Sequence, residues 1–218
     1  MSFDLASHLG ATTRVVDDCM HDGRPARMVV ATCSYATDAA DLWDALTNAE
    51  RIPRWFLPVS GKLRLGGRYQ LEGNAGGEIT TCEPPERLAV TWEYGGQMSW
   101  VTLMLAPAGD GRTRLTLEHV AHREGGEEFW AQFGPGAVGV GWDLALMGLG
   151  KHIATGEALD AGREQQWVVS PEGKQFVKHV SDGWCRAAIA GGEEAGPARA
   201  AAERTRAFYT GEAPAEGS

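Results

Sequence analysis

The chain has 218 residues, of which 43% are hydrophobic and 22% are charged, and this ordinary globular composition excludes fibrous and wholly disordered proteins. Its 29 acidic residues outnumber its 20 basic residues, so a net charge of −9 argues against a nucleic-acid partner. Tryptophan is the commonest aromatic residue, with eight copies against six Phe and four Tyr, and such rings gather in cores and at binding surfaces.

The cysteines and the longest apolar run indicate the compartment in which we expect the protein and whether it inserts into a membrane. The four cysteines are isolated in the sequence and form no CxxC motif. With no recognisable signal peptide, this pattern predicts reduced thiols and a cytoplasmic protein. The apolar run 134–150 carries Asp143 at its centre, which favours a buried helix over a transmembrane span. We therefore expect no membrane insertion.

The N-terminal part predicts a β-hairpin followed by two short helices. Segments 14–17 and 26–35 flank a turn-rich stretch, HDGRP, and the second segment is rich in β-branched residues. Asp38 is the expected N-cap of a first helix. Residues 47–50 fit a capping box for a second helix, which must end before Pro58.

Six strands of an antiparallel meander are predicted next, separated by turns rich in glycine or proline. They cover residues 62–65, 68–71, 78–82, 87–94, 99–106 and 112–120. Alternation of apolar and polar residues gives this sheet one packed face and one polar face. Trp92, Leu103, Leu117 and His119 fall on the packed face.

The remaining chain is predicted to be mainly helical. A long helix covers about 136–155, and Ser170 with the following proline marks the start of another that carries Phe176, Val180 and Trp184 at spacings of four. Large apolar residues on an outer sheet face usually mark something packed there. We expect these C-terminal helices to cover the outer-face residues Trp100 and Met104 or to build a homodimer.

Two polar residues in apolar surroundings each have two interpretations. Asp143 either lies on a structural seam, paired with an arginine, or is a cavity acid with a raised pKa. His119 is either a histidine bonded to nearby backbone or a group that orients a ligand or acts as a base. A metal set of Glu118, His119 and His122 is disfavoured, because adjacent strand residues point to opposite faces.

Several separated blocks together resemble a known superfamily. They are YATDAADLWDALTNAERIPRWFLP, LRLGGRYQL, GGEITTCEPPERLAVTWEY and WVTLMLAPAGDGRTRLTLEH. In this order they resemble the START-like (SRPBCC) superfamily, and within it bacterial homologues of the heat-shock-protein ATPase activator domain. The resemblance implies an α+β helix-grip fold, in which a curved antiparallel sheet wraps around a long C-terminal helix. It also implies a hydrophobic pocket between the two.

This resemblance and the element pattern predict four regions. Residues 1–26 are an N-terminal segment with one extra strand, and 27–160 form the START-like domain. Residues 161–211 are a helical C-terminal extension, and 212–218 read as a disordered tail.

The predicted ligand site lies between the sheet and the long helix. Trp55 and Phe56 close one end in the family pattern, whereas Trp130 and Phe133 precede the long helix where a lid would sit. The expected ligand-binding residues are Trp55, Phe56, Tyr69, Leu71, Trp92, Leu103, Leu117, His119, Trp130, Phe133, Trp142 and Leu146.

We therefore expect the protein to bind a hydrophobic small molecule, such as a lipid, a polyketide-like compound or an aromatic compound, mainly by burying its apolar surface. Two alternatives stay open: a cyclase or hydrolase-like enzyme that uses the same pocket with His119 as base, and a chaperone-linked or other protein-interaction module. No GxSxG motif, cysteine–histidine pair or phosphate-binding loop stands out, so we expect no cofactor, no metal and no other catalytic residue.

Overall fold

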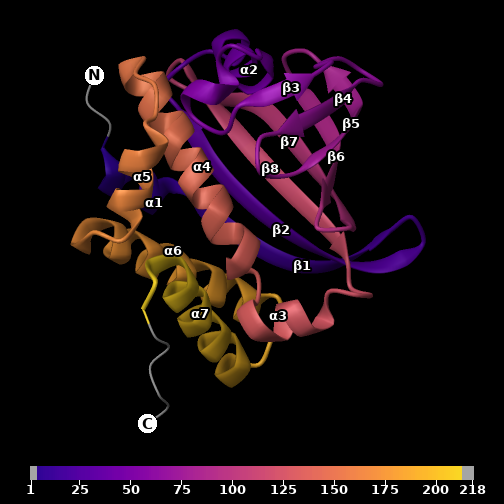
Figure 1. Cartoon of the computed structure of the whole chain (residues 1–218), viewed down its shortest axis with the longest axis vertical. Coiled ribbons are helices and arrows are strands. Elements are labelled where there is room, and N and C mark those ends of the chain that lie inside the picture. Colours follow the sequence, from indigo (N-terminus) through magenta and orange to yellow (C-terminus); the bar gives the residue numbers. More distant parts are fainter. Residues whose placement is uncertain (1–3, 213–218) are drawn as a thin grey trace. The chain divides into compact units, whose positions relative to one another are not determined.

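A computed structural model of the chain describes residues 4–212 (Figure 1). The predicted disordered tail, 212–218, lies outside the described residues except for Glu212. The chain divides into two compact units, here called the sheet unit and the helical unit. The sheet unit comprises Met1–Thr13, Val30–Ala121 and Ala145–Leu159, and the helical unit comprises Arg14–Val29, His122–Leu144 and Asp160–Ser218.

The strands form one eight-stranded sheet in the order β1-β2-β8-β7-β6-β5-β4-β3, and the fold is of the α+β helix-grip class. Their bounds are β1 Thr13–His21, β2 Arg24–Tyr35, β3 Val59–Gly61, β4 Arg68–Leu71, β5 Gly76–Glu83, β6 Arg87–Tyr94, β7 Gln97–Gly109 and β8 Arg112–His122. Every strand pair from β3 to β8 for which the register is defined is antiparallel. The predicted N-terminal hairpin is present as β1 and β2, which turn at two residues with positive φ, Asp22 and Gly23.

Cross-strand rows confirm the predicted faces of the sheet. Leu88, Leu103 and Leu117 form one row across β6, β7 and β8, and Val90, Val101 and His119 form the next. Residues opposite each other in antiparallel strands share a face, so these two rows lie on the same side. The alternate positions, among them Trp100 and Met104, lie on the other side, as the alternation predicted.

Two hydrogen bonds identify the face that the long helix covers. The helix is α4, Gly136–Thr155, at the predicted position. On one face of the sheet, the Thr32 hydroxyl of β2 contacts the Thr116 hydroxyl of β8 at 3.4 Å. Tyr35 points to the opposite face, where its hydroxyl donates a 3.0 Å hydrogen bond to the Leu146 carbonyl oxygen of α4. The second half of α4 therefore packs on the face that carries Leu117 and His119.

Two local predictions were wrong. Residues 62–65 are not a strand: Gly66 and Gly67 belong to a longer turn, in which the Gly66 N–H donates to the Ile79 carbonyl oxygen, and β3 pairs with β4 instead. Residues 47–50 do not form a capping box, because the Thr47 hydroxyl bonds back to the Trp43 carbonyl oxygen inside a helix. Only a short 3₁₀ turn follows it.

The other helices are mostly short, and four of them lie in the helical unit. Their bounds are α1 Leu5–Ala11, α2 Ala39–Thr47, η1 Ile52–Arg54, α3 Glu127–Phe133, α5 Ala161–Val168, α6 Pro171–Ala190 and α7 Ala195–Thr210. Ser170 caps α6 as predicted, and its side chain accepts from the Gly173 N–H. In the helical unit α6 and α7 lie side by side, with α3 against α7 (Figure 1).

A buried carboxylate organises the helical unit. Asp143, in the first half of α4, is only 1% exposed. Its two oxygens accept hydrogen bonds from Arg14 of β1, with Nε to Oδ2 at 3.0 Å and Nη2 to Oδ1 at 2.5 Å. The Trp184 indole N–H of α6 donates to Oδ2 at 2.7 Å. The structural seam with an arginine partner is therefore confirmed for Asp143.

This arrangement changes the role expected for Trp184. We predicted that the residue covers the outer sheet face or joins a dimer, but it is 1% exposed and lies against α4 of its own unit. A Cβ at Gly139 would collide with the Trp184 indole, so the absence of a side chain there lets the ring reach Asp143. The reason is electrostatic. A buried carboxylate without hydrogen-bond donors costs more free energy than an indole ring that gives up an apolar neighbour.

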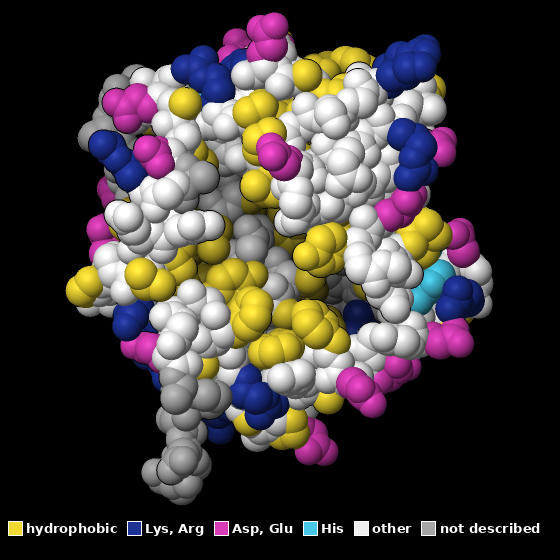
Figure 2. Space-filling view, in the orientation of Figure 1, with side chains coloured by type: hydrophobic (Ala, Val, Ile, Leu, Met, Phe, Trp, Pro, Cys, Tyr) yellow, Lys and Arg dark blue, Asp and Glu magenta, His cyan; other side chains and the backbone are white. Residues whose placement is uncertain are grey.

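Surface properties agree with the charge balance of the sequence. On the face shown in Figure 2, Lys and Arg side chains are scattered among Asp and Glu side chains rather than gathered in one large patch. Within residues 4–212, no helix is both long enough and apolar enough to cross a membrane.

Replacing Asp143 by alanine should lower the free energy of unfolding by about 3–5 kcal/mol, because the Arg14 guanidinium would stay buried without its counter-ion. Urea unfolding followed by circular dichroism measures this change. The matched control is Asp182→Ala on α6, whose partner Lys178 is exposed, and it should cost less than about 1 kcal/mol. Equal effects of the two substitutions would contradict the central role of Asp143.

Candidate functional site

The candidate site is the apolar face of the sheet unit. Tyr69, Leu71 and Ile79 form a buried cluster on β4 and β5. Partly buried side chains from the segment between η1 and β4 and from strands β5 and β6 pack against this cluster. They are Phe56, Leu57, Val59, Leu63, Cys82, Leu88, Val90 and Trp92. This face therefore presents a continuous set of apolar groups.

Burial is uneven along the cross-strand rows of this face. Val101 and Leu117 are buried, whereas Leu88, Val90 and Leu103 in the same rows are only half-buried. Trp92, in the row beside them, is also half-buried. Apolar side chains of a packed face that keep contact with solvent are what a binding surface for an apolar ligand requires.

His119 belongs to one of these rows and is held by a short hydrogen-bonded chain. Its Nε2 lies 2.8 Å from the Ser99 Oγ, and the Ser99 hydroxyl donates to the Trp92 carbonyl oxygen at 3.2 Å. Because the hydroxyl has one hydrogen, both bonds form together when Nε2 carries the proton and donates to Ser99. The Trp92 ring centroid is 6.2 Å from that of His119.

Burial makes His119 a neutral group. The residue is 8% exposed, and loss of water around the ring lowers the pKa of His119 from its ordinary 6.5 to about 4. At neutral pH it is therefore an uncharged imidazole, suited to a hydrogen bond rather than an ion pair.

Ser99 was not among the predicted site residues, although the sequence held a signal for it. The two-glycine turn between β6 and β7 pairs Tyr94 with Gln97, and counting outward from that pair places Ser99 opposite Trp92. Residues Leu88 and Val90 were assigned to the correct face but left out of the expected site.

Some predicted site residues use their polar atoms within the fold. The Trp55 indole N–H donates to the Ala45 carbonyl oxygen of α2 at 2.9 Å, and its ring stacks on Phe56 with centroids 5.4 Å apart. The Tyr69 hydroxyl donates to the Thr91 carbonyl oxygen at 2.8 Å, and burial raises the pKa of Tyr69. Both residues therefore support the site through their ring surfaces.

The predicted site residues fall in different units. Trp55, Phe56, Tyr69, Leu71, Trp92, Leu103, Leu117, His119 and Leu146 belong to the sheet unit. Trp130, Phe133 and Trp142 belong to the helical unit, so their role as a lid or as ligand contacts remains a prediction. In its own unit, Trp130 donates its indole N–H to Glu193 at 2.8 Å.

Within residues 4–212, no group of three or more His, Cys, Asp or Glu side chains could hold a metal ion. His21 and His122 lie near each other, with ring centroids 5.9 Å apart, but His122 Nε2 bonds the His21 carbonyl oxygen.

The low pKa of His119 predicts acid sensitivity. The unfolded chain binds a proton at His119 below pH 6.5, whereas the folded chain binds it only near pH 4. The free energy of unfolding should therefore fall as pH drops from 6.5 to 4, by up to about 3 kcal/mol. Urea titrations across this range measure the slope. His119→Gln should flatten it, and an unchanged slope in this variant would contradict the assignment.

Comparisons with known proteins agree on the family. Residues 36–154 match the family model described as Activator of Hsp90 ATPase homolog 1-like protein. The crystal structure of CalU16 from Micromonospora echinospora shares 33% identity with this chain, covering 82% of this chain and 99% of that one, with a TM-score of 0.65. Its solution structure gives 33% identity, coverage of 83% and 97%, and a TM-score of 0.68.

A more distant similarity shows the fold alone. DynU16, a protein of the dynemicin biosynthetic locus, is 23% identical, with coverage of 60% of this chain and 48% of that one and a TM-score of 0.52. No curated protein matches the sequence. The family model spans more than half of the chain, and CalU16 is similar over nearly its whole length. The chain therefore belongs to the Activator of Hsp90 ATPase homolog 1-like family of the START-like (SRPBCC) superfamily.

Proposed function

We propose that the protein binds a hydrophobic small molecule on the apolar face of the sheet unit, beside the second half of α4. The observation that carries this proposal is the uneven burial of apolar side chains along the cross-strand rows of that face. Leu88, Val90, Trp92 and Leu103 remain half-buried on a face whose neighbouring residues Ile79, Val101 and Leu117 are buried. Covering such side chains with an apolar ligand gains about 25 cal/mol per Å² of surface removed from water.

The polar groups of this face suit an uncharged ligand. His119 is neutral at pH 7, and Ser99 fixes its ring. An aromatic or lipid-like molecule with a carbonyl or hydroxyl group would place its apolar body on Trp92 and Leu103 and its polar group toward this pair. A charged ligand group would lose its hydration on this apolar face, and the neutral His119 would not act as its counter-ion.

A substitution pair on β7 tests the proposal. Leu103 and Met104 are adjacent and both half-buried, but they lie on opposite faces of the sheet. Leu103→Asn should weaken binding about 10-fold or more, because it replaces an apolar contact worth about 1.5–3 kcal/mol by a polar one. Met104→Asn is the matched control and should leave the affinity within about twofold, since its side chain faces away.

The ligand for this test comes from the protein itself. Native mass spectrometry of protein purified from its own host should reveal a bound small molecule, which then serves in titrations followed by tryptophan fluorescence. If the protein is empty and a broad library of hydrophobic compounds leaves its fluorescence unchanged, the proposal fails. Stimulation of an Hsp90 ATPase by such an empty protein would instead support the chaperone-linked alternative, which the name of the family raises.

A catalytic role for the same site is the second candidate, and the neutral His119 imidazole is the observation that favours it. A group with a pKa of about 4 is an uncharged imidazole at pH 7, so it is available as a base, although such a low pKa makes it a weak one. In that case His119→Ala should abolish turnover of the identified ligand while the dissociation constant changes little. Comparing steady-state turnover with fluorescence affinity separates the two functions. Absence of any product with the wild-type protein rules out catalysis on that ligand.

A further inference from the structure

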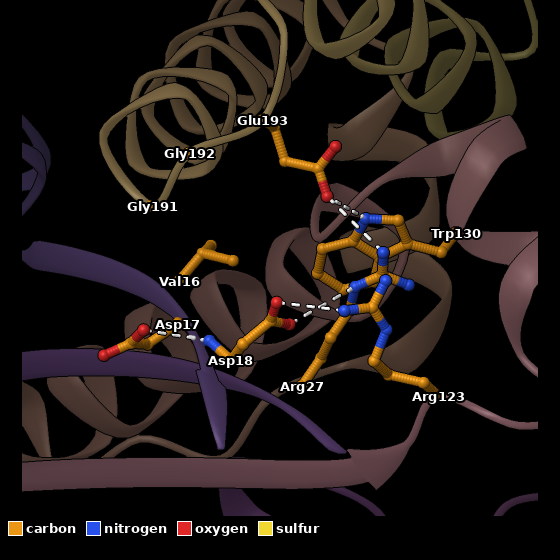
Figure 3. Close-up of a pocket in the computed structure, with 9 residues that line it drawn as sticks. All are labelled: Val16, Asp17, Asp18, Arg27, Arg123, Trp130, Gly191, Gly192 and Glu193. Carbon is orange, nitrogen blue, oxygen red and sulfur yellow. Dashed lines mark hydrogen bonds and ion pairs between the residues drawn. The ribbon is translucent and has the colours of Figure 1, made fainter. Parts of the chain in front are cut away.

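A cavity lies within the helical unit. Its volume is about 250 Å³, and both acidic and basic side chains line it (Figure 3). The lining residues are Val16, Asp17, Asp18, Arg27, Arg123, Trp130, Gly191, Gly192 and Glu193. We call this cavity the charged cleft.

Arg27 has unused hydrogen-bond donors in the charged cleft. Its side chain is only 16% exposed, and its guanidinium carbon lies 4.4 Å from the centroid of the Trp130 ring. Its carboxylate neighbours are distant, with Nε 3.9 Å from Asp18 Oδ1 and Nη2 3.6 Å from Glu193 Oε1. These separations exceed hydrogen-bond length, and Arg27 makes no hydrogen bond to any described residue. A guanidinium so far withdrawn from water calls for an acceptor.

A second guanidinium adds to the positive side of the charged cleft. Arg123 Nη1 donates to Asp18 Oδ2 at 3.0 Å. Burial and the nearby positive charge of Arg123 lower the pKa of Arg27, and the two neighbouring guanidinium groups repel each other. An anionic group placed between them would relieve this repulsion and could receive two parallel hydrogen bonds from Arg27.

Acidic side chains also line the charged cleft. Glu193 uses Oε1 for the Trp130 indole, and its Oε2 has no hydrogen bond in the described part of the chain. Asp17 accepts the Asp18 N–H through Oδ1. In Figure 3 the Asp17 carboxylate points away from the two guanidinium groups, whereas those of Asp18 and Glu193 point toward them. Gly191, at the C-terminal end of the 20-residue helix α6, adds the negative end of the helix dipole.

We propose that the charged cleft binds a small zwitterion of the α-amino-acid class, with its carboxylate on Arg27 and Arg123 and its ammonium group on Glu193. The two guanidinium groups are already balanced by Asp18 and Glu193, so a purely anionic ligand would add uncompensated negative charge. A zwitterion adds none. The volume lies below the 300–1,000 Å³ typical of drug-sized ligands, which suits a molecule the size of an amino acid.

Three molecules of matched shape test the proposal on the full-length protein. L-leucine carries both charges, 4-methylpentanoate lacks the amine and 3-methylbutylamine lacks the carboxylate. Nuclear magnetic resonance titrations at pH 7 follow the indole N–H signal of Trp130, identified by its loss in Trp130→Phe. Leucine should shift this signal to saturation, and each analogue should bind at least about 10-fold more weakly, because each loses one set of charge-assisted hydrogen bonds.

Substitutions on one strand locate the site. Arg27→Lys keeps the charge but removes the paired donors, so leucine should bind it at least about 10-fold more weakly. Arg24→Lys is the matched control three residues earlier, where the arginine pairs with exposed Glu124 outside the cleft, and it should bind leucine as the wild-type protein does. Arg123→Lys, at a more exposed position, replaces Arg27→Lys if that variant does not fold.

Three results would overturn the proposal. They are no shift of the Trp130 signal with leucine, equal affinity for leucine and 4-methylpentanoate, and unchanged leucine binding by the arginine variants of the cleft. None of these measurements involves a ligand of the sheet unit, so their failure would not contradict the proposed function, and the reverse also holds.

Discussion

A charge in the middle of an apolar helix constrains the helical unit more than any other single feature. Asp143 cannot be buried alone, because an unpaired carboxylate in a protein interior costs several kcal/mol. Three elements distant in sequence meet to satisfy it: Arg14 enters from β1 and Trp184 from α6, while α4 supplies the carboxylate. The resulting cluster accounts for Gly139, where any side chain would push the indole away. The bonds are directional, so they specify how these elements pack as well as stabilising them.

In the sheet unit, the alternation of side chains between the two faces of each strand decides which residues face α4. Once Tyr35 reaches the Leu146 carbonyl oxygen, every residue in register with it on that side belongs to the covered face. His119 then shares the apolar face with Leu117, and its burial leaves it uncharged. The same face keeps Trp92 and Leu103 in contact with solvent, a combination suited to an uncharged, mostly apolar ligand.

The two proposed sites differ in how they treat polar groups. On the sheet face, His119 is neutral and held by Ser99, so selectivity would come from shape and one hydrogen bond. In the charged cleft, Arg27 lies on Trp130 between carboxylates that stay too far away for hydrogen bonds. That cleft would select its ligand by the positions of the ligand's positive and negative groups. Apolar burial would therefore dominate the first affinity and electrostatic complementarity the second.

The sequence by itself determined what depends on neighbours in the chain. The bounds of α4, the N-cap of α6 at Ser170 and the face of each residue on β6, β7 and β8 follow from local periodicity and capping chemistry. Local patterns failed at residues 62–65, where hydrogen bonds to Ile79 on another strand override a glycine turn signal. Tertiary structure alone decided that Arg14 pairs with Asp143, 129 residues away, and that Arg27 meets Arg123 and Glu193. Such partners are chosen by desolvation and long-range packing, for which spacing along the chain carries no signal.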